Sequence, residues 1–239
     1  MTLEISTTQI ERWMLAFADR IMEKQDYLTE LDAAIGDGDH GLNMGRGVER
    51  LRERLADRMA ESGAHSAGEL DKEPDNIGVL LRTIAMTLIS GVGGAAGALY
   101  GSFFLNAAKE ATMLLNSGPN VERTISAPEL AQILRSGLEG LKQRGKAHMG
   151  EKTMIDAFEP AVDAMQTSIA EGDNLSSAIV AARHAAENGM IKTIELQALK
   201  GRASYLGPRS VGHQDPGATS TSYLFEAAQK AFAPNRETK

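Results

Sequence analysis

The sequence predicts an all-α fold with about eight helices. Apolar residues recur at steps of three and four residues along nearly the whole chain, which is the spacing of one helix face. No turn dipeptide lies between alternating, strand-like segments, so no β-hairpin is expected. A chain of 239 residues can bury a sizeable core. We therefore expect a single domain in which neighbouring helices run antiparallel.

The first half of the chain is expected to hold four helices. Trp13, Phe17 and Ile21 recur at four-residue steps, and Leu31 extends the same amphipathic helix to an acidic loop. A polar, glycine-containing stretch at 62–75 is interpreted as a long surface connection. The other three helices are expected around 44–55, 77–88 and 99–115.

The second half begins with a strong helix start. Ser126 offers a capping hydroxyl, Pro128 falls in the first turn, and Glu129 suits the positive end of the helix. Asn174 is expected to cap a later helix. The remaining helices are expected at 130–141, 154–169, 174 to roughly 190–199, and 219–232.

Charge and composition exclude several classes of function. The chain has 25 basic and 32 acidic residues, a net charge of −7, which disfavours nucleic acid as a partner. It contains no cysteine, so a disulfide scaffold, a thiolate nucleophile and a cysteine-ligated metal are excluded. No apolar run is long enough for a membrane span, and the first ten residues lack the pattern of a signal peptide. The expected location is cytoplasmic, with no membrane partner.

The acidic loop at 32–43, DAAIGDGDHGLN, is the most informative segment. Asp37 and Asp39 lie two residues apart, so their side chains project from one side of an extended stretch, and Asp32 can join them from the preceding helix. Three carboxylates this close repel one another unless a cation lies between them, and oxygen ligands suit Mg²⁺. The alternative is an ordinary turn or helix cap.

A glycine-rich loop, SGVGGAAG, follows at 90–97 between two expected helices. Glycine lets the backbone approach a phosphate closely, and the N–H groups at a helix start favour an anion. The loop lacks the Gly-Lys-Ser/Thr ending of a Walker A motif and the preceding strand of a dinucleotide-binding fingerprint. Close helix packing around small residues is the alternative.

A third polar loop, at 200–220, carries Arg202, Arg209, His213 and Asp215. A loop of this length inside a compact domain is more often a binding loop or lid than a simple connection. Arginine can pair with phosphate oxygens through its planar fork of donors. The alternative is a tight turn at Asp215, a helix cap at Thr219 and solvated arginines. Together the three loops favour a site for a nucleotide with Mg²⁺.

Several motifs in these loops resemble one known family. They are GDGDHGLNM at 36–44, MTLISGVGGAAG at 86–97, GK at 145–146 with KTM at 152–154, and KGRASYLG at 200–207 with GHQDPGATS at 212–220. In this order they resemble the nucleotide-binding L subunit of dihydroxyacetone kinases, DhaL. The resemblance implies one DhaL-like nucleotide-binding domain over 1–239. Its core would cover about 8–232, with surface insertions at about 62–75 and 116–126.

The resemblance also implies an eight-helix antiparallel barrel that holds ADP or ATP at one end through two Mg²⁺ ions. By position, Asp32, Asp37 and Asp39 match the family's metal ligands, and no residue is assigned as an acid or base. Met154 is expected against the base, and Ala96 stands where the family often has serine. The positions that match nucleotide contacts are His40, Gly41, Leu42, Asn43, Ala95, Ala96, Gly145, Met154, Arg202, Asp215, Pro216 and Gly217.

The implied function is that of a kinase subunit with an alcohol group as acceptor. It would pass the γ-phosphoryl group to dihydroxyacetone, or a related small ketose, held on a separate K subunit. A phosphohistidine M subunit of a phosphoenolpyruvate system would then recharge the bound ADP. The alternatives are an ATP-exchanging kinase subunit for a small ketose or polyol and a nucleotide-loaded regulatory module. A homodimer is left open.

Overall fold

The computed structural model describes residues 4–63, 76–116 and 124–233. Its long helices, in chain order, are α1 (Thr7–Glu23), α2 (Gln25–Ile35), α3 (His40–Gly63), α4 (Ile77–Gly91), α5 (Gly94–Asn116), α6 (Ala127–Gly145), α7 (Ile155–Ala170), α8 (Leu175–Lys192) and α9 (Pro216–Phe232). Two 3₁₀ helices, η1 (Thr193–Glu195) and η2 (Arg202–Ser210), lie between α8 and α9. Within these ranges the extended pairing is limited to a β-bridge between Ile5 and Ile125. The prediction of an all-α fold is confirmed.

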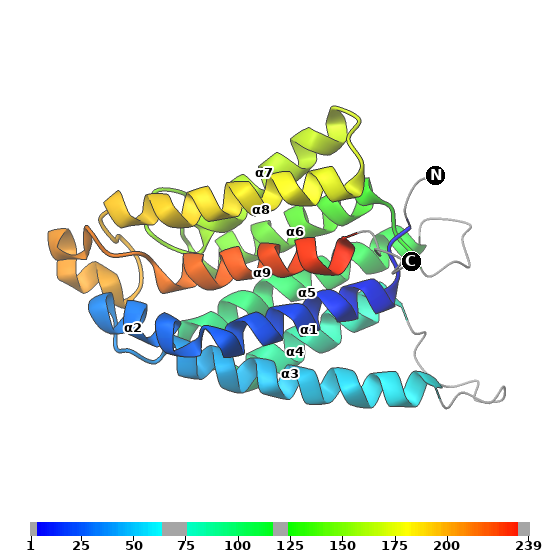
Figure 1. Cartoon of the computed structure of the whole chain (residues 1–239), viewed down its shortest axis with the longest axis horizontal. Helices are drawn as coiled ribbons and strands as arrows, with labels where there is room; N and C mark the ends of the chain where they lie inside the picture. The colour runs from blue at the N-terminus through cyan, green and yellow to red at the C-terminus, as the bar shows by residue number, and fades with distance from the viewer. Residues whose placement is uncertain (1–3, 64–75, 117–123, 234–239) are drawn as a thin grey trace, which may run out of the picture.

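Eight of the described helices close into a ring (Figure 1). Each helix from α3 to α9 packs on the next, and α1 contacts both α9 and α3 to complete the circle. Directions alternate around the ring, so that α3, α5, α7 and α9 all begin at the end where α1, α4, α6 and α8 finish. The shorter α2 lies at this same end against α3 and α9. The eight-helix antiparallel barrel is therefore confirmed.

The interior of the ring is filled by apolar side chains. Phe17, Tyr100, Phe158 and Phe225, from α1, α5, α7 and α9, form a continuous chain of rings with centroids 5.7 to 6.2 Å apart. Trp13 is also buried, and its indole N–H donates to the carbonyl of Leu224 at 2.7 Å. Because aromatic side chains bury large areas, this cluster ties four helices of the ring together.

The single helix predicted before the acidic loop is in fact two helices. Lys24 departs from helical geometry with φ −109° and ψ 13°, and α2 begins at the next residue. Its N–H is still satisfied, by the carbonyls of Arg20 and Ile21 at 3.1 and 3.2 Å. Leu28 of α2 remains fully buried, so the apolar spacing continues across the break and conceals it.

The predicted helix caps are confirmed at two places. Ser126 and Glu129 form a capping box at α6, in which the Glu129 carboxylate accepts from the Ser126 N–H at 2.7 Å. The Asn174 side chain accepts from the N–H of Ser177 at 3.0 Å at the start of α8. The alternative that Thr219 caps the last helix is wrong. Thr219 lies inside α9, where its hydroxyl donates to the carbonyl of Asp215, which is the actual cap.

Other helix boundaries differ from the prediction by a few residues. Helix α5 starts at Gly94 instead of 99, because the small residues of the glycine-rich loop adopt helical geometry. Helix α8 ends at Lys192, within the predicted range of 190–199, and gives way to η1. The polar loop that was predicted at 200–220 contains the 3₁₀ helix η2, where no helix was expected.

Parts of the two predicted insertions lie outside the described residues, namely 64–75 and 117–123. The remainder of each insertion belongs to the ends of α3 and α5 and to the approach to α6. Among the helices that are described, none has the length and apolar character that a membrane span requires.

Candidate functional site

A cavity of about 650 Å³ lies at the end of the barrel where α3, α5, α7 and α9 begin. The loops that join α2 to α3, α4 to α5, α6 to α7 and α8 to α9 all contribute to its lining. The cavity therefore brings together the three chemically distinctive loops of the sequence. The predicted site residues in its wall are Asp32, Asp37, Asp39, His40, Asn43, Ala95, Ala96, Gly145, Met154, Arg202, Asp215, Pro216 and Gly217.

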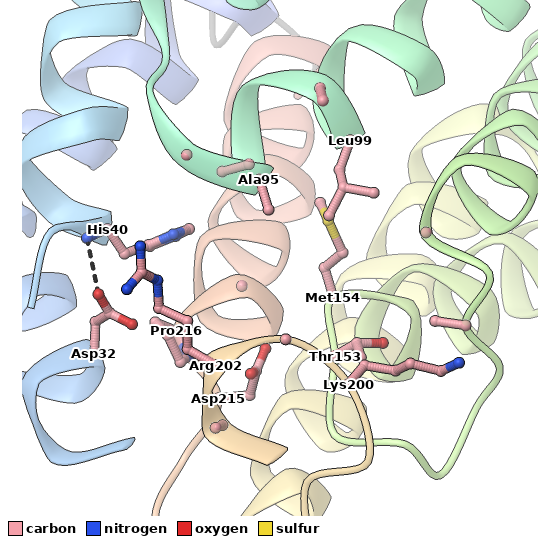
Figure 2. A pocket seen from close by; sticks show the side chains of 18 of the residues that line it. Asp32, His40, Ala95, Leu99, Thr153, Met154, Lys200, Arg202, Asp215 and Pro216 are labelled. Carbon is pink, nitrogen blue, oxygen red and sulfur yellow. Dashed lines mark hydrogen bonds between the residues drawn. The ribbon is translucent and has the colours of Figure 1, made fainter. Parts of the chain in front are cut away.

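The three aspartates of the acidic loop converge at one end of this cavity. Asp32 projects from the last turn of α2, and one carboxylate oxygen from each aspartate lies within 4.8 Å of the other two. Asp32 Oδ2 accepts hydrogen bonds from the backbone N–H groups of Asp39 and His40 at 2.8 and 3.1 Å, and Figure 2 shows the one from His40. Gly38, with φ +72°, supplies the left-handed turn between the other two acids. The loop thus presents a ready-made cluster of oxygen ligands.

A positive side chain already lies beside this cluster. Arg202 of η2 pairs with Asp37 at 3.0 Å, although the arginine side chain is 69% exposed. The three carboxylates supply only oxygen donors, which is the ligand type of hard divalent cations such as Mg²⁺. The residues present therefore fit a magnesium site. The guanidinium group of Arg202 would lie beside it and add further positive charge.

The start of α5 forms a second wall. Gly94 has φ +64°, which favours glycine, and a Cβ atom placed on Gly93 would lie 2.5 Å from Asn43 Oδ1, so a side chain there would displace Asn43. Ala95 and Ala96 follow in the first turn of the helix. The first four N–H groups of a helix lack partners within it and carry partial positive charge. This wall is thus suited to bind phosphate.

The other end of the cavity has an apolar surface, although Thr153 and Lys200 also lie on that side (Figure 2). Leu99 of α5 and Met154, at the start of α7, face one another on the side away from Asp32 and His40 (Figure 2). Leu141, Ala147 and Ile155 also line the cavity. A flat aromatic group is well suited to such a surface, whereas a charged group is not.

His40 links the acidic loop to the floor of the cavity. Its Nε2 atom lies 3.1 Å from the hydroxyl of Ser220, which lies 3.0 Å from the hydroxyl of Tyr100. Burial lowers the pKa of His40, although the charges of Asp32 and Asp39 oppose this effect. The imidazole is therefore biased toward its neutral form. Burial also raises the pKa of Tyr100 to about 12, so its hydroxyl stays protonated.

Asp215 is the buried cap of α9, with 8% of its surface exposed. Its Oδ2 atom accepts from the backbone N–H of Ala218 at 2.7 Å. Burial raises the pKa of Asp215 to about 7, and the hydrogen bond from Ala218 and the charge of Lys152 only partly oppose this. Figure 2 shows the carboxylate near Pro216 at the bottom of the cavity. Asp215 thus changes charge near neutral pH.

Two of the residues expected to contact nucleotide do not line the cavity. Gly41 packs on α2, where an added Cβ would lie 2.0 Å from the carbonyl oxygen of Gln25. Leu42 points outward and is 52% exposed. Both follow His40 on the first turn of α3, and the helical rotation carries them away from the cavity that His40 and Asn43 face.

Several lining residues were missed by the sequence interpretation. Leu99 and Tyr100 belong to the apolar pattern of α5, which looks the same whether it faces the core or a cavity. Lys152 and Thr153 precede Met154, and the sequence indicated them only as members of the KTM motif. Lys200, close to Arg202, was likewise indicated only as part of a motif, KGRASYLG.

Comparison with known proteins identifies the family of the chain. The family model of the DAK2 domain matches residues 34–230. The chain is 42% identical over 216 residues to the ADP-binding subunit DhaL of PEP-dependent dihydroxyacetone kinase 1 from Listeria innocua, covering 90% of this chain and 92% of that relative. It is 41% identical to the DhaL subunit of the PEP-dependent dihydroxyacetone kinase of Escherichia coli, covering 94% and 96% of the two chains.

A solved structure supports the fold. The dihydroxyacetone kinase of C. freundii in complex with AMP-PNP and Mg²⁺ matches with a TM-score of 0.66 and 24% sequence identity. The match covers 96% of this chain but 35% of that kinase chain, so the similarity concerns about a third of the larger protein. Apart from Asp32, the residues that line the cavity fall within the residues matched by the family model. The chain therefore belongs to the DAK2 domain family, and it is similar over nearly its whole length to ADP-binding DhaL subunits of dihydroxyacetone kinases.

Proposed function

We propose that this chain is the nucleotide-binding subunit of a dihydroxyacetone kinase. It holds ADP or ATP with Mg²⁺ and passes the γ-phosphoryl group to dihydroxyacetone, or a related small ketose, on a separate K subunit. The observation that carries the proposal is the order of chemistry along one cavity: carboxylates, then helix N-termini, then an apolar end. A magnesium-bound nucleotide has the same order, from metal and phosphates to base. The names of the two similar DhaL subunits, both ADP-binding, support this proposal.

The metal ligands in this proposal are Asp32, Asp37 and Asp39. A single Mg²⁺ commonly takes one or two carboxylates from a protein, so three carboxylates provide enough oxygens for the two ions that the family resemblance implies. Bound Mg²⁺ would neutralise the phosphates and the charge that spreads over the transferred group. The aspartates act through charge and position, without a proton transfer of their own.

The remaining residues orient the nucleotide. The N–H groups around Ala95 and Ala96 would bind phosphate oxygens, with Arg202 closing the site from η2. His40, Asn43 and the turn from Asp215 to Gly217 would contact the nucleotide from the opposite wall. Met154, across from Leu99, would pack on the base, and Gly145 lies beside Leu99. Because phosphoryl transfer depends mainly on positioning and electrostatics, this division accounts for the chemistry required of the subunit.

The K subunit would dock over the mouth of the cavity. Exposed apolar side chains occur on the loops there, with Met149, Leu199 and Tyr205 at 59%, 56% and 88% exposure. The two loops that carry Met149 and Leu199 are joined, since the N–H of Leu199 donates to the carbonyl of Glu151 at 3.1 Å. Exposed apolar side chains beside a polar site would suit contact with a partner subunit. The PEP dependence of the similar subunits supports recharging of bound ADP by a phosphohistidine M subunit.

The test is the nucleotide and Mg²⁺ content of the protein purified without added nucleotide, followed by exchange with labelled ATP. Stoichiometric ADP that survives gel filtration and exchanges slowly is the expected result, as for a coenzyme recharged in place. An empty cavity that binds ATP rapidly would instead identify an ATP-exchanging kinase subunit. Absence of nucleotide binding under both conditions would refute the proposal.

A further inference from the structure

Lys152 is a buried lysine in the wall of the cavity. Only 1% of its surface is exposed, and it precedes the loop residues Thr153 and Met154. Its backbone has φ +59°, in the left-handed region that residues other than glycine rarely adopt. A buried charge and a left-handed backbone each cost stability. The surrounding structure must therefore compensate for both.

The ammonium group of Lys152 makes three hydrogen bonds to backbone carbonyls. Nζ donates to the carbonyls of Thr193 and Leu196 at 2.5 and 3.2 Å, and also to that of His213. An ammonium group has three N–H donors, so these bonds use all of them. Lys152 therefore has no donor left for a ligand in the cavity, and it acts on the cavity through the segments that it joins.

These segments are the end of α8 and the approach to α9. Thr193 and Leu196 belong to η1 and the residue after it, whereas His213 lies two residues before Asp215. Thr193 forms a second tie between the same segments, because its hydroxyl accepts from the N–H of Asp215 at 3.0 Å and donates to Met190 O at 2.6 Å. Lys152 and Thr193 together fix the turn that begins α9.

The charges near this turn support the same role. Burial lowers the pKa of Lys152, and the carboxylates of Asp215 and Asp156 oppose this effect. The charge of Lys152 in turn lowers the pKa of Asp215 against the effect of burial. Lys152 thus favours the charged form of the same residue whose backbone it helps to hold.

We propose that Lys152 is a positioning residue for the nucleotide site, which sets the Asp215–Pro216–Gly217 turn in the place where it meets the ligand. It does so without touching the ligand. This inference rests on the proposed function, because the ligand used to test it is Mg-ADP.

The test compares Mg-ADP affinity and stability in variants of the full chain. Lys152→Met removes the ammonium group but keeps a long side chain, and it is expected to raise the Kd for Mg-ADP in calorimetry by roughly 10- to 100-fold, as for other residues that orient ligand-binding groups. Thr193→Val removes the second tie at nearly constant volume and is expected to weaken binding less. Because both changes act on one turn, the double variant is expected to bind little more weakly than Lys152→Met.

A control separates positioning from a general loss of stability. Leu55 is fully buried in α3, toward the end of the barrel away from the cavity. Leu55→Ala is expected to lower the unfolding temperature while leaving the Kd for Mg-ADP unchanged.

Folded Lys152→Met protein that binds Mg-ADP as tightly as the wild type would overturn the inference. Should that variant not fold, the Kd of Thr193→Val decides, with an unchanged value counting against the inference. A wild-type protein without affinity for Mg-ADP would instead refute the proposed function.

Discussion

At the scale of single residues, Asp37 provides a direct test of the metal site. It is paired only with an exposed arginine, so its replacement should change stability by less than about 1 kcal/mol. As a proposed metal ligand, however, it should matter strongly for the nucleotide. We expect Asp37→Asn to weaken retention of Mg-ADP by at least about tenfold, equivalent to about 1.4 kcal/mol. The measurement is nucleotide content after desalting, together with the Kd in calorimetry.

A matched control for this variant is Asp19→Asn. Asp19 is likewise exposed and pairs with an arginine, Arg52, but it lies on α1 outside the cavity. We expect this change to leave nucleotide content unaltered. Equal nucleotide content in wild type, Asp19→Asn and Asp37→Asn would argue against the metal assignment.

Asp215 should make stability depend on pH. Its pKa is about 7 in the folded protein and 3.8 for an ordinary aspartate, so the folded state holds a proton that the unfolded state releases. The contribution of Asp215 to the free energy of unfolding should therefore fall as pH rises from about 4 to about 7, by up to about 1.4 kcal/mol per unit, and be constant above that range. Asparagine cannot titrate, yet its amide oxygen can still cap α9.

The stability of Asp215→Asn relative to wild type should accordingly increase between about pH 4 and pH 7. Denaturant unfolding of both proteins across this range measures the difference. A difference that does not vary with pH would show that Asp215 is not the titrating group.

At the scale of helices, the capping box of α6 gives a prediction about stability alone. Ser126→Ala removes the hydroxyl that accepts from the N–H of Glu129, and it should lower the free energy of unfolding by about 1 kcal/mol. Denaturant unfolding measures this change. Ser177→Ala, at an exposed position in α8, is the control, and it should change stability by less than about 0.5 kcal/mol. Nucleotide affinity should be the same in both variants, because neither residue lines the cavity.

Much of the helical architecture could be predicted from local signals. Apolar spacing located the helices, and Ser126 and Asn174 were identified as caps, because both signals depend on neighbours within a few residues. The break at Lys24 could not be predicted, because the apolar spacing is the same on both sides of it. Helix α5 begins earlier than expected, at Gly94, for a different reason, because its first turn consists of glycine and alanine and shows no apolar spacing.

The candidate site could likewise be predicted only where its residues lie close together in the sequence. Asp32, Asp37 and Asp39 lie within eight residues of one another, so a local argument was enough to bring them together. The pairing of Asp37 with Arg202 joins residues far apart in the sequence and depends on closure of the ring. The three carbonyls around Lys152 also belong to distant segments, and backbone groups leave no trace in the amino-acid pattern.

At the scale of the whole molecule, the alternating ring directs four helix N-termini toward one cavity. Helices α3, α5, α7 and α9 all begin there with first-turn residues in the cavity lining, so the partial positive charges of their free N–H groups lie close to the place where phosphate is proposed to bind, even though α4, α6 and α8 end at the same face. This field does not depend on any single side chain. A protein with a net charge of −7 can in this way attract a polyphosphate to one end.

Ligand binding at this end should stabilise the entire barrel, because each wall of the cavity belongs to a different part of the ring. At a concentration 100 times its Kd, Mg-ADP should add about 2.7 kcal/mol to the free energy of unfolding. For a chain of this size, the unfolding temperature should rise by roughly 5 to 10 °C. Thermal unfolding with Mg-ADP, with ADP plus EDTA and with Mg²⁺ alone measures the effect. An equal rise with ADP plus EDTA would show that binding does not require the metal.

The closure of the ring through α1 and α9 also matters for engineering. Trp13 and Phe232 are in edge-to-face contact with ring centroids 5.9 Å apart, and α1 starts and α9 ends at the face opposite the cavity (Figure 1). A short peptide could therefore join the last helix to the first, and new termini could be opened elsewhere on that face. Such a circular permutant should retain the cavity. An anchoring group attached at the same face would leave the cavity open to solvent when the protein is immobilised on a sensor.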